Sequence, residues 1–289
     1  TFHALFARLL RFDIDKFKDP EGLTWTRQFS IYDETDAQSL IKEIVTQDLQ
    51  LDPKRFEPKK VRWAISNAKN QCLLPDDLLK DQEGQRGKLV SETYRLYRKA
   101  LAANNALDFD DLLLIPVQLL QQNEKIRTYW HNRFKHVLVD EYQDTNKPQF
   151  FFLSKIAEQH KNICVVGDDD QSIYGWRGAD IANILKFEKI FPSCKTFTLE
   201  KNYRSTQQIL DAATAVVSHN EKRAQKNLIA NNGDGDPLVL IETKDELEEA
   251  DAIISALEKE IKLQKRNFSH FSVLYRTNAQ SRALEDSFR

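Results

Sequence analysis

The sequence has few sulfur-containing residues. It contains no methionine, not even at position 1, and its cysteines are Cys72, Cys164 and Cys194. No two cysteines have C-x-x-C spacing, so we expect neither a zinc site nor a disulfide framework. Cys164 stands in an apolar run, which predicts a small buried side chain. From the missing methionine we expect an internal piece of a longer protein.

A strong charge of either sign and a long hydrophobic run are also missing. The formal net charge of the 289 residues is −2, which argues against a protein that coats nucleic acid by charge alone. A protein that grips one strand in a groove is still allowed. No signal peptide and no apolar run of about 20 residues occur. We therefore expect a cytoplasmic protein with no membrane partner.

A phosphate-binding loop is a third absence. Gly84–Leu89 contains two glycines and a lysine, but their spacing is not that of the G-x-x-x-x-G-K-[ST] loop. Leu89 also lacks the hydroxyl that such a loop offers to Mg²⁺. We expect this segment to be a flexible loop.

The most informative stretch runs from His136 to Gly178. Its apolar runs His136–Val139 and Ile163–Gly167 each predict a buried strand, and residues 146–159 between them are long enough for a helix. This order predicts a strand–helix–strand unit with parallel strands. Because ligands bind at the carboxyl ends of the strands in open α/β sheets, we expect the polar residues after both strands to form a site.

The polar residues after these strands suit nucleotide hydrolysis. Asp140 and Glu141 follow the first strand, where an aspartate can hold Mg²⁺ and a glutamate can take a proton from the attacking water. An isolated Asp-Glu pair is more commonly a solvated strand end. Gln171 follows the second strand and precedes Tyr174 and Trp176. These residues favour a nucleotide site next to a site for a flat aromatic ligand.

The rest of the chain alternates between helical and mixed patterns. Apolar spacing predicts helices over residues 2–11, through most of 31–105 and over 180–191, and strands at 196–199, 238–241 and 271–275. The helical part carries a basic cluster, Lys54, Arg55, Lys59, Lys60 and Arg62. This cluster is either a solvated face or a contact with duplex phosphates.

Two strings closely resemble motifs II and III of the UvrD/Rep/PcrA-type superfamily 1 DNA helicases. They run from Val139 to Asn146 (VDEYQDTN) and from Val166 to Gly178 (VGDDDQSIYGWRG). Thr1–His3 (TFH) resembles motif Ib of the same family, and Glu200–Thr206 (EKNYRST) resembles motif IV. The resemblance extends over nearly the whole chain.

The resemblance implies a role in ATP hydrolysis for each matching residue. Asp140 would bind Mg²⁺ and Glu141 would activate water. Gln171 would contact the γ-phosphate of ATP. Tyr203 would stack near the adenine, and Arg204 would reach the γ-phosphate as an arginine finger.

The resemblance also implies binding of single-stranded DNA and of junctions between single and double strands. The residues implied there are Thr1, Phe2, His3, Tyr174, Trp176 and Arg177. From its surroundings alone, Trp176 is either a core aromatic or a surface on which bases stack. Gly175 and Gly178 flank it and suit an irregular exposed loop, which favours stacking.

The implied fold is α/β, with the RecA-like parallel sheet of the P-loop NTPases. The first motor domain would comprise residues 1–30 and 106–198, interrupted by an all-helical insertion over 31–105. A second RecA-like domain would begin in residues 199–289.

The implied function is that of an ATP-dependent DNA helicase or translocase in DNA repair or replication, moving 3′ to 5′ by family analogy. The phosphate loop is absent, and motifs V and VI would lie beyond Arg289. We therefore expect this fragment to be inactive alone. The motor of a helicase–nuclease and a non-hydrolysing DNA-binding relative stay open as alternatives. The intact set of Asp140, Glu141, Gln171 and Arg204 argues against the second.

Overall fold

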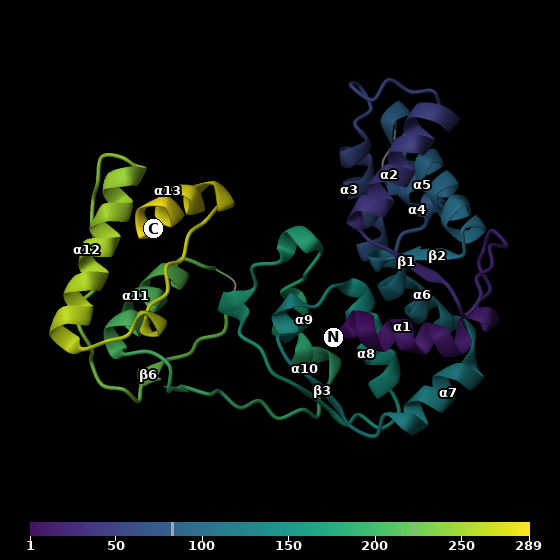
Figure 1. The fold of residues 1–289 in the computed structure, drawn as a ribbon. Coiled ribbons are helices and arrows are strands. Elements are labelled where there is room, and N and C mark those ends of the chain that lie inside the picture. The colour runs from purple at the N-terminus through teal and green to yellow at the C-terminus, as the bar shows by residue number, and fades with distance from the viewer. Residues whose placement is uncertain (82–83, 222) are drawn as a thin grey trace. The chain divides into compact units, whose positions relative to one another are not determined.

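A computed structural model describes residues 1–81, 84–221 and 223–289. The chain divides into two units, Thr1–Phe197 with Asn220–Gln225 and Thr198–His219 with Lys226–Arg289. Both units combine helices with a short pair or pairs of parallel strands (Figure 1). The mixed α/β class expected from the sequence is confirmed.

The elements of the first unit follow one another from Phe2 to Ile190. Its helices are α1 (Phe2–Asp13), α2 (Glu34–Glu43), α3 (Pro58–Asn70), α4 (Pro75–Asp81), α5 (Gln85–Ala103), α6 (Phe109–Gln122), α7 (Glu124–Arg133), α8 (Lys147–Ala157), α9 (Ala182–Leu185) and α10 (Phe187–Ile190). Its strands are β1 (Ser30–Tyr32), β2 (Ala106–Asp108), β3 (Val137–Val139) and β4 (Ile163–Val165).

Strand β1 precedes the helical part of the sequence, and strand β2 follows it. They pair in parallel, with Ser30 opposite Ala106 and Tyr32 opposite Asp108. The helical part therefore begins and ends at this pair of strands. Helices α2 to α5 lie together on one side of the pair (Figure 1). These helices share their own core, which includes Ile41, Ile65, Tyr94 and Leu101.

The prediction of a flexible loop at residues 84–89 is wrong for most of that segment. Helix α5 begins at Gln85 and includes Gly87 and Lys88. Gly84 precedes the helix with φ +113°, a backbone angle that glycine adopts without a steric penalty. The two glycines thus mark a helix start.

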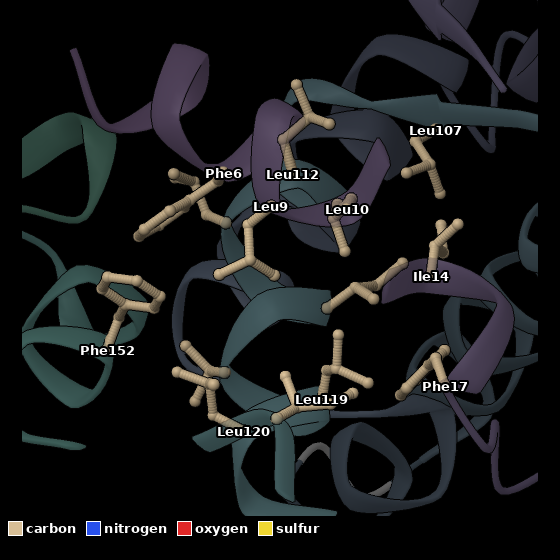
Figure 2. Close-up of a cluster of buried hydrophobic side chains, with 14 of the residues drawn as sticks. Phe6, Leu9, Leu10, Ile14, Phe17, Leu107, Leu112, Leu119, Leu120 and Phe152 are labelled. Carbon is tan, nitrogen blue, oxygen red and sulfur yellow. The ribbon is translucent and has the colours of Figure 1, made fainter. Parts of the chain in front are cut away.

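A second core lies between α1, α6 and α8. Phe6, Leu9 and Leu10 of α1 are fully buried against α6, whose segment 112–120 is apolar except for Gln118. The ring of Phe6 lies 4.3 Å from that of Phe152 on α8, centroid to centroid (Figure 2). Burying side chains of this size contributes about 1.5–3 kcal/mol each. This core holds α1 and α8 against α6.

Strands β3 and β4 form the strand–helix–strand unit expected from the sequence. They pair in parallel, Val139 lies opposite Val165, and α8 connects them. The expected burial of Cys164 is wrong, because its side chain is exposed. Its partner in the register, Leu138, is 81% exposed. Alternate side chains point to opposite faces of a strand, and here only one face packs against the described helices.

The second unit contains fewer strands than its sequence predicts. Its elements are β5 (Lys201–Asn202), α11 (Gln207–Val217), β6 (Ile229–Ala230), α12 (Glu246–Gln264) and α13 (Ser281–Phe288). The runs at 196–199, 238–241 and 271–275 are irregular in the described structure, and most of their apolar side chains are exposed. A buried strand needs a paired neighbour, and these runs have none among the described residues.

The helix expected over residues 180–191 is also divided, into α9 and α10 with Lys186 between them. None of the helices in the described parts of the chain is long and apolar enough to cross a membrane.

Candidate functional site

Two acidic residues stand at the carboxyl end of β3. Both Asp140 and Glu141 are exposed, and the Glu141 N–H donates to Asp140 Oδ1 across 2.9 Å. Glu141 has φ +50°, in the left-handed region that residues with a side chain rarely occupy. Backbone of this kind is concentrated at functional sites. Here it turns the chain sharply after the strand, so that both carboxylates lie at the same strand end.

The buried amide of Gln143 connects this turn to the end of β4. Its Nε2 donates to Glu141 Oε2 across 2.8 Å, and its Oε1 accepts from the Asp168 N–H across 3.0 Å. Gly167 makes room for it, because a Cβ there would lie 2.5 Å from Gln143 Oε1. Sequence reasoning overlooked Gln143, although its place inside the VDEYQDTN string was a signal.

Three consecutive aspartates follow β4. The carboxylates of Asp168, Asp169 and Asp170 lie within 4.8 Å of one another. Asp170 accepts two hydrogen bonds from Arg223, at 3.0 and 2.8 Å, which offset part of this negative charge. Gln171 completes the turn, and its Nε2 donates to Asp168 Oδ2 across 2.8 Å. The Gln171 amide is thereby held at the end of β4, next to the end of β3 that carries Glu141.

A groove of about 1260 Å³ lies beside this strand end, within the first unit. Tyr174, Trp176, Arg177 and Gly178 form one wall. The Arg177 guanidinium carbon lies 4.5 Å from the Trp176 ring centre, and the Trp176 side chain is 68% exposed. Of the two interpretations of Trp176, the structure therefore excludes a core aromatic.

The backbone turn after Trp176 depends on Gly178. Gly178 has φ +85°, and a Cβ on it would lie 3.1 Å from the Asn70 Cβ of α3. Asn70 in turn accepts a hydrogen bond from the Asn146 amide across 2.6 Å and donates to Asp110 across 3.0 Å. The floor of the groove is thus a hydrogen-bonded junction of α3, α6 and α8.

Of the three N-terminal residues expected to contact DNA, only His3 lines the groove. Its ring meets that of Phe109 edge to face, with centroids 5.9 Å apart. Burial lowers the pKa of His3, with partial opposition from Asp110. Thr1 caps α1 through its hydroxyl, and the Phe2 ring packs on Phe6. Their contact with DNA stays a prediction.

Helix α3 supplies another wall of the groove, which the sequence indicated only through its basic cluster. The α3 residues that line the groove are Lys59, Arg62, Trp63, Ser66, Asn67 and Asn70. Arg62 is buried and pairs with Glu34 at 3.1 Å and Asp110 at 3.0 Å. Trp63 is 64% exposed. The other members of the basic cluster, Lys54, Arg55 and Lys60, do not line the groove.

A buried ion cluster lies beneath the groove. Lys69 Nζ approaches Asp108 at 2.9 Å and Asp111 at 2.7 Å, and the Tyr97 hydroxyl donates to Asp108 at 2.9 Å. Burial opposes the ionisation of Asp108, but Lys69 and Arg62 outweigh it and hold its pKa at about 2. Burial and the neighbouring Asp108 raise the pKa of Asp111 to about 7. Asp108 is close to both Lys69 and Arg62, whereas Asp111 is close to Lys69 alone among the described basic side chains, so Asp111 keeps its proton more readily.

Tyr203 and Arg204 belong to the second unit. The Asn202 Oδ1 accepts hydrogen bonds from the Arg204 and Ser205 N–H groups, at 2.9 and 2.8 Å. The Asn232 amide donates to the Tyr203 carbonyl across 2.9 Å. Both side chains are exposed, so each is available to a ligand.

Comparison with known proteins decides the family. The profile of the UvrD/REP helicase N-terminal domain matches residues 1–192, and that of the UvrD-like helicase C-terminal domain matches residues 197–289. The chain belongs to the UvrD/REP helicase family. Helicase domains of this type are RecA-like, and the resemblance found in the sequence motifs is confirmed.

Curated members of the family are similar along the whole chain. It is 44% identical over 288 residues to the ATP-dependent DNA helicase PcrA of Staphylococcus epidermidis, and 43% identical to that of Staphylococcus aureus. Each alignment covers 100% of this chain and 38% of the relative. The chain therefore spans well under half the length of these helicases.

Proposed function

We propose that this chain is a motor segment of an ATP-dependent DNA helicase or translocase that moves 3′ to 5′ along one strand. One observation carries the proposal. The end of β3 with Asp140 and Glu141 and the end of β4 with Gln171 lie side by side, joined through Gln143. The names of the similar PcrA proteins support the same activity.

The strand ends fit a nucleotide with a divalent cation. Asp140 offers an exposed carboxylate, the kind of oxygen ligand that Mg²⁺ takes from proteins. Bound Mg²⁺ would neutralise negative charge on the phosphate groups, and ATP would supply the phosphoryl group that water attacks. Glu141, oriented by Gln143, accepts a proton from the attacking water. Gln171, held by Asp168, contacts the terminal phosphate and stands near the start of the DNA groove.

The second unit contributes two further side chains in this proposal. Tyr203 stacks on the adenine, the role that the family resemblance implies, and its exposed ring is accessible for it. Arg204 donates to the terminal phosphate as an arginine finger. Asn202 fixes the turn that carries both residues.

The groove of the first unit binds single-stranded DNA in this proposal. Bases stack on Tyr174 and Trp176, Arg177 lies beside them, and His3 contacts the backbone of the strand. Residues 31–105 form the helical insertion of a first motor domain made of 1–30 and 106–198, and the second motor domain begins at 199. At a junction between single-stranded and double-stranded DNA, the duplex would lie near the insertion. The whole protein would act in DNA repair or replication, in the cytoplasm.

A strand-displacement assay with the intact protein tests the proposal. The substrates are partial duplexes with a single-stranded tail at the 3′ end or at the 5′ end. We expect ATP-dependent release of the displaced strand from the 3′-tailed substrate only. A protein that binds both substrates but neither hydrolyses ATP nor moves would be the non-hydrolysing relative instead.

A further inference from the structure

Helix α3 presents an exposed tryptophan that the proposed DNA contacts do not use. Val61, Ile65 and Ala68 are buried in the core of the helical part. Trp63 lies on the other side of α3 and is 64% exposed, beside the buried Arg62. Tryptophan is highly buried on average, and exposed tryptophans are enriched where a protein binds a partner. The position of Trp63 therefore needs an explanation outside the core.

Trp63 lines the same groove as Trp176. Lys59 and Asn67, one turn before and one turn after Trp63 on the same face of α3, also line it. The wall therefore carries a flat apolar surface between a cation and an amide. This arrangement suits a nucleotide, whose base can stack on the indole while its phosphate lies near the ammonium group.

The charges of the groove make stacking the main source of affinity there. Its basic side chains are Lys59, Arg62 and Arg177, and its acidic ones are Glu34, Asp110 and Asp144. Arg62 is already paired with Glu34 and Asp110. A groove with balanced charges attracts a polyanion weakly, so aromatic faces must supply much of the binding. The same balance gives no reason to expect a strongly acidic or basic protein segment in the groove.

We propose that Trp63 is a second stacking surface for single-stranded DNA, in the same groove as the one formed by Tyr174 and Trp176. This inference rests on the proposed function and extends it, because it assigns the α3 wall to the strand itself and not to duplex phosphates. Bases bound on both walls lengthen the stretch of strand that the first unit holds. Lys59 contacts a phosphate of the same strand.

The test measures binding of labelled oligo-dT by the intact protein over a range of salt concentrations. We expect Trp63→Ala to weaken binding about tenfold without changing the dependence on salt, because stacking releases no counterions. Trp63→Phe should keep most of the affinity, since it keeps an aromatic face. Lys59→Ala should lower the slope of log affinity against log salt by about 0.7, the value for one phosphate of a single strand. Tyr129→Ala is the matched control, because Tyr129 is 55% exposed but lies outside the groove, and it should change nothing.

A second readout locates the contact directly. Oligonucleotides that carry 5-iodouracil should crosslink to the peptide containing Trp63 on irradiation, and thermal melts should show that Trp63→Ala leaves the fold intact. Full affinity in Trp63→Ala, with no crosslink at Trp63, would overturn this inference. If Trp176→Ala still weakened binding in that case, the proposed function would stand. If neither variant weakened binding, both proposals would fall.

Discussion

Gln143 donates a hydrogen bond to Glu141 across 2.8 Å from a side chain that is almost completely buried. Its other amide atom accepts from the backbone at the end of the neighbouring strand. The proposed general base is therefore held by a residue that has no chemical role of its own. Orientation of this kind matters because small displacements of a reacting group cost a large part of its rate advantage.

The first prediction concerns Gln143→Ala in the intact protein. A hydrogen bond to a charged group contributes roughly 1.5–3 kcal/mol, so we expect ATP turnover to fall about tenfold or more. Binding of ATP should change little, because Gln143 is not proposed to touch it.

Gln143→Glu is the informative companion, since a second carboxylate beside Glu141 should raise the pKa of Glu141. The acid limb of its rate profile should then move to higher pH. Normal turnover in Gln143→Ala would show that Glu141 needs no such support.

The second prediction concerns the pH dependence of stability. Asp111 has a pKa of about 7 in the folded chain, well above that of an unfolded aspartate. Between about pH 4 and 7 the folded state therefore binds more protons than the unfolded state. The stability that Asp111 contributes is complete below about pH 4 and is lost as the pH rises through 7. Asp108, with its pKa lowered to about 2, contributes stability that is lost only below about pH 4.

Urea unfolding between pH 4 and 8 tests whether the contribution of Asp111 to the free energy of unfolding falls as the pH rises. The slope due to Asp111 should approach at most about 1.4 kcal/mol per pH unit. In Asp111→Asn this slope should disappear, because asparagine cannot lose a proton. A stability that rises from pH 4 to 7 in the unaltered chain, and does so equally in Asp111→Asn, would contradict the assignment.

The third prediction concerns Trp176→Ala. Stacking of a base on an aromatic side chain contributes roughly 1–3 kcal/mol, so affinity for oligo-dT should fall about ten- to hundredfold with little dependence on base sequence. ATP hydrolysis without DNA should stay near normal, and its stimulation by DNA should decrease. A thermal melt of the same variant should change little, since the side chain is largely exposed. Unchanged affinity together with a large loss of stability would argue against this role.

The nucleotide end of the site could be predicted from the sequence because its residues directly follow two recognisable strands. β3 and β4 are continuous apolar runs that end in polar residues, so periodicity and spacing were enough to place Asp140, Glu141 and Gln171 on neighbouring strand ends. The resemblance then supplied the roles. The turn residue Gln143 lies in the same string, but its importance depends on Gly167, which becomes its neighbour only after the strands pair.

The α3 wall of the groove could not be predicted in this way. Trp63 and Trp176 are more than a hundred residues apart, and no pattern in α3 distinguishes a groove face from a solvated one. The hydrogen bond between Asn70 and Asn146 forms only because the pairing of β1 with β2 brings the helical part next to α6 and α8. The exposure of Cys164 was equally hidden, because an apolar run predicts burial without showing whether both faces of the strand are covered.

The most direct test of the account is the Glu141→Gln variant of the intact protein. Glutamine keeps the shape of the side chain and removes the base, so turnover of ATP in the presence of DNA should fall by a factor on the order of 10²–10⁴. ATP binding should be nearly unchanged, whereas Asp140→Asn should weaken binding that depends on Mg²⁺. The measurement is phosphate release under saturating oligo-dT, alongside a titration with a fluorescent ATP analogue. The account predicts a protein that still binds nucleotide and DNA but scarcely hydrolyses ATP, and near-normal turnover in Glu141→Gln would contradict it.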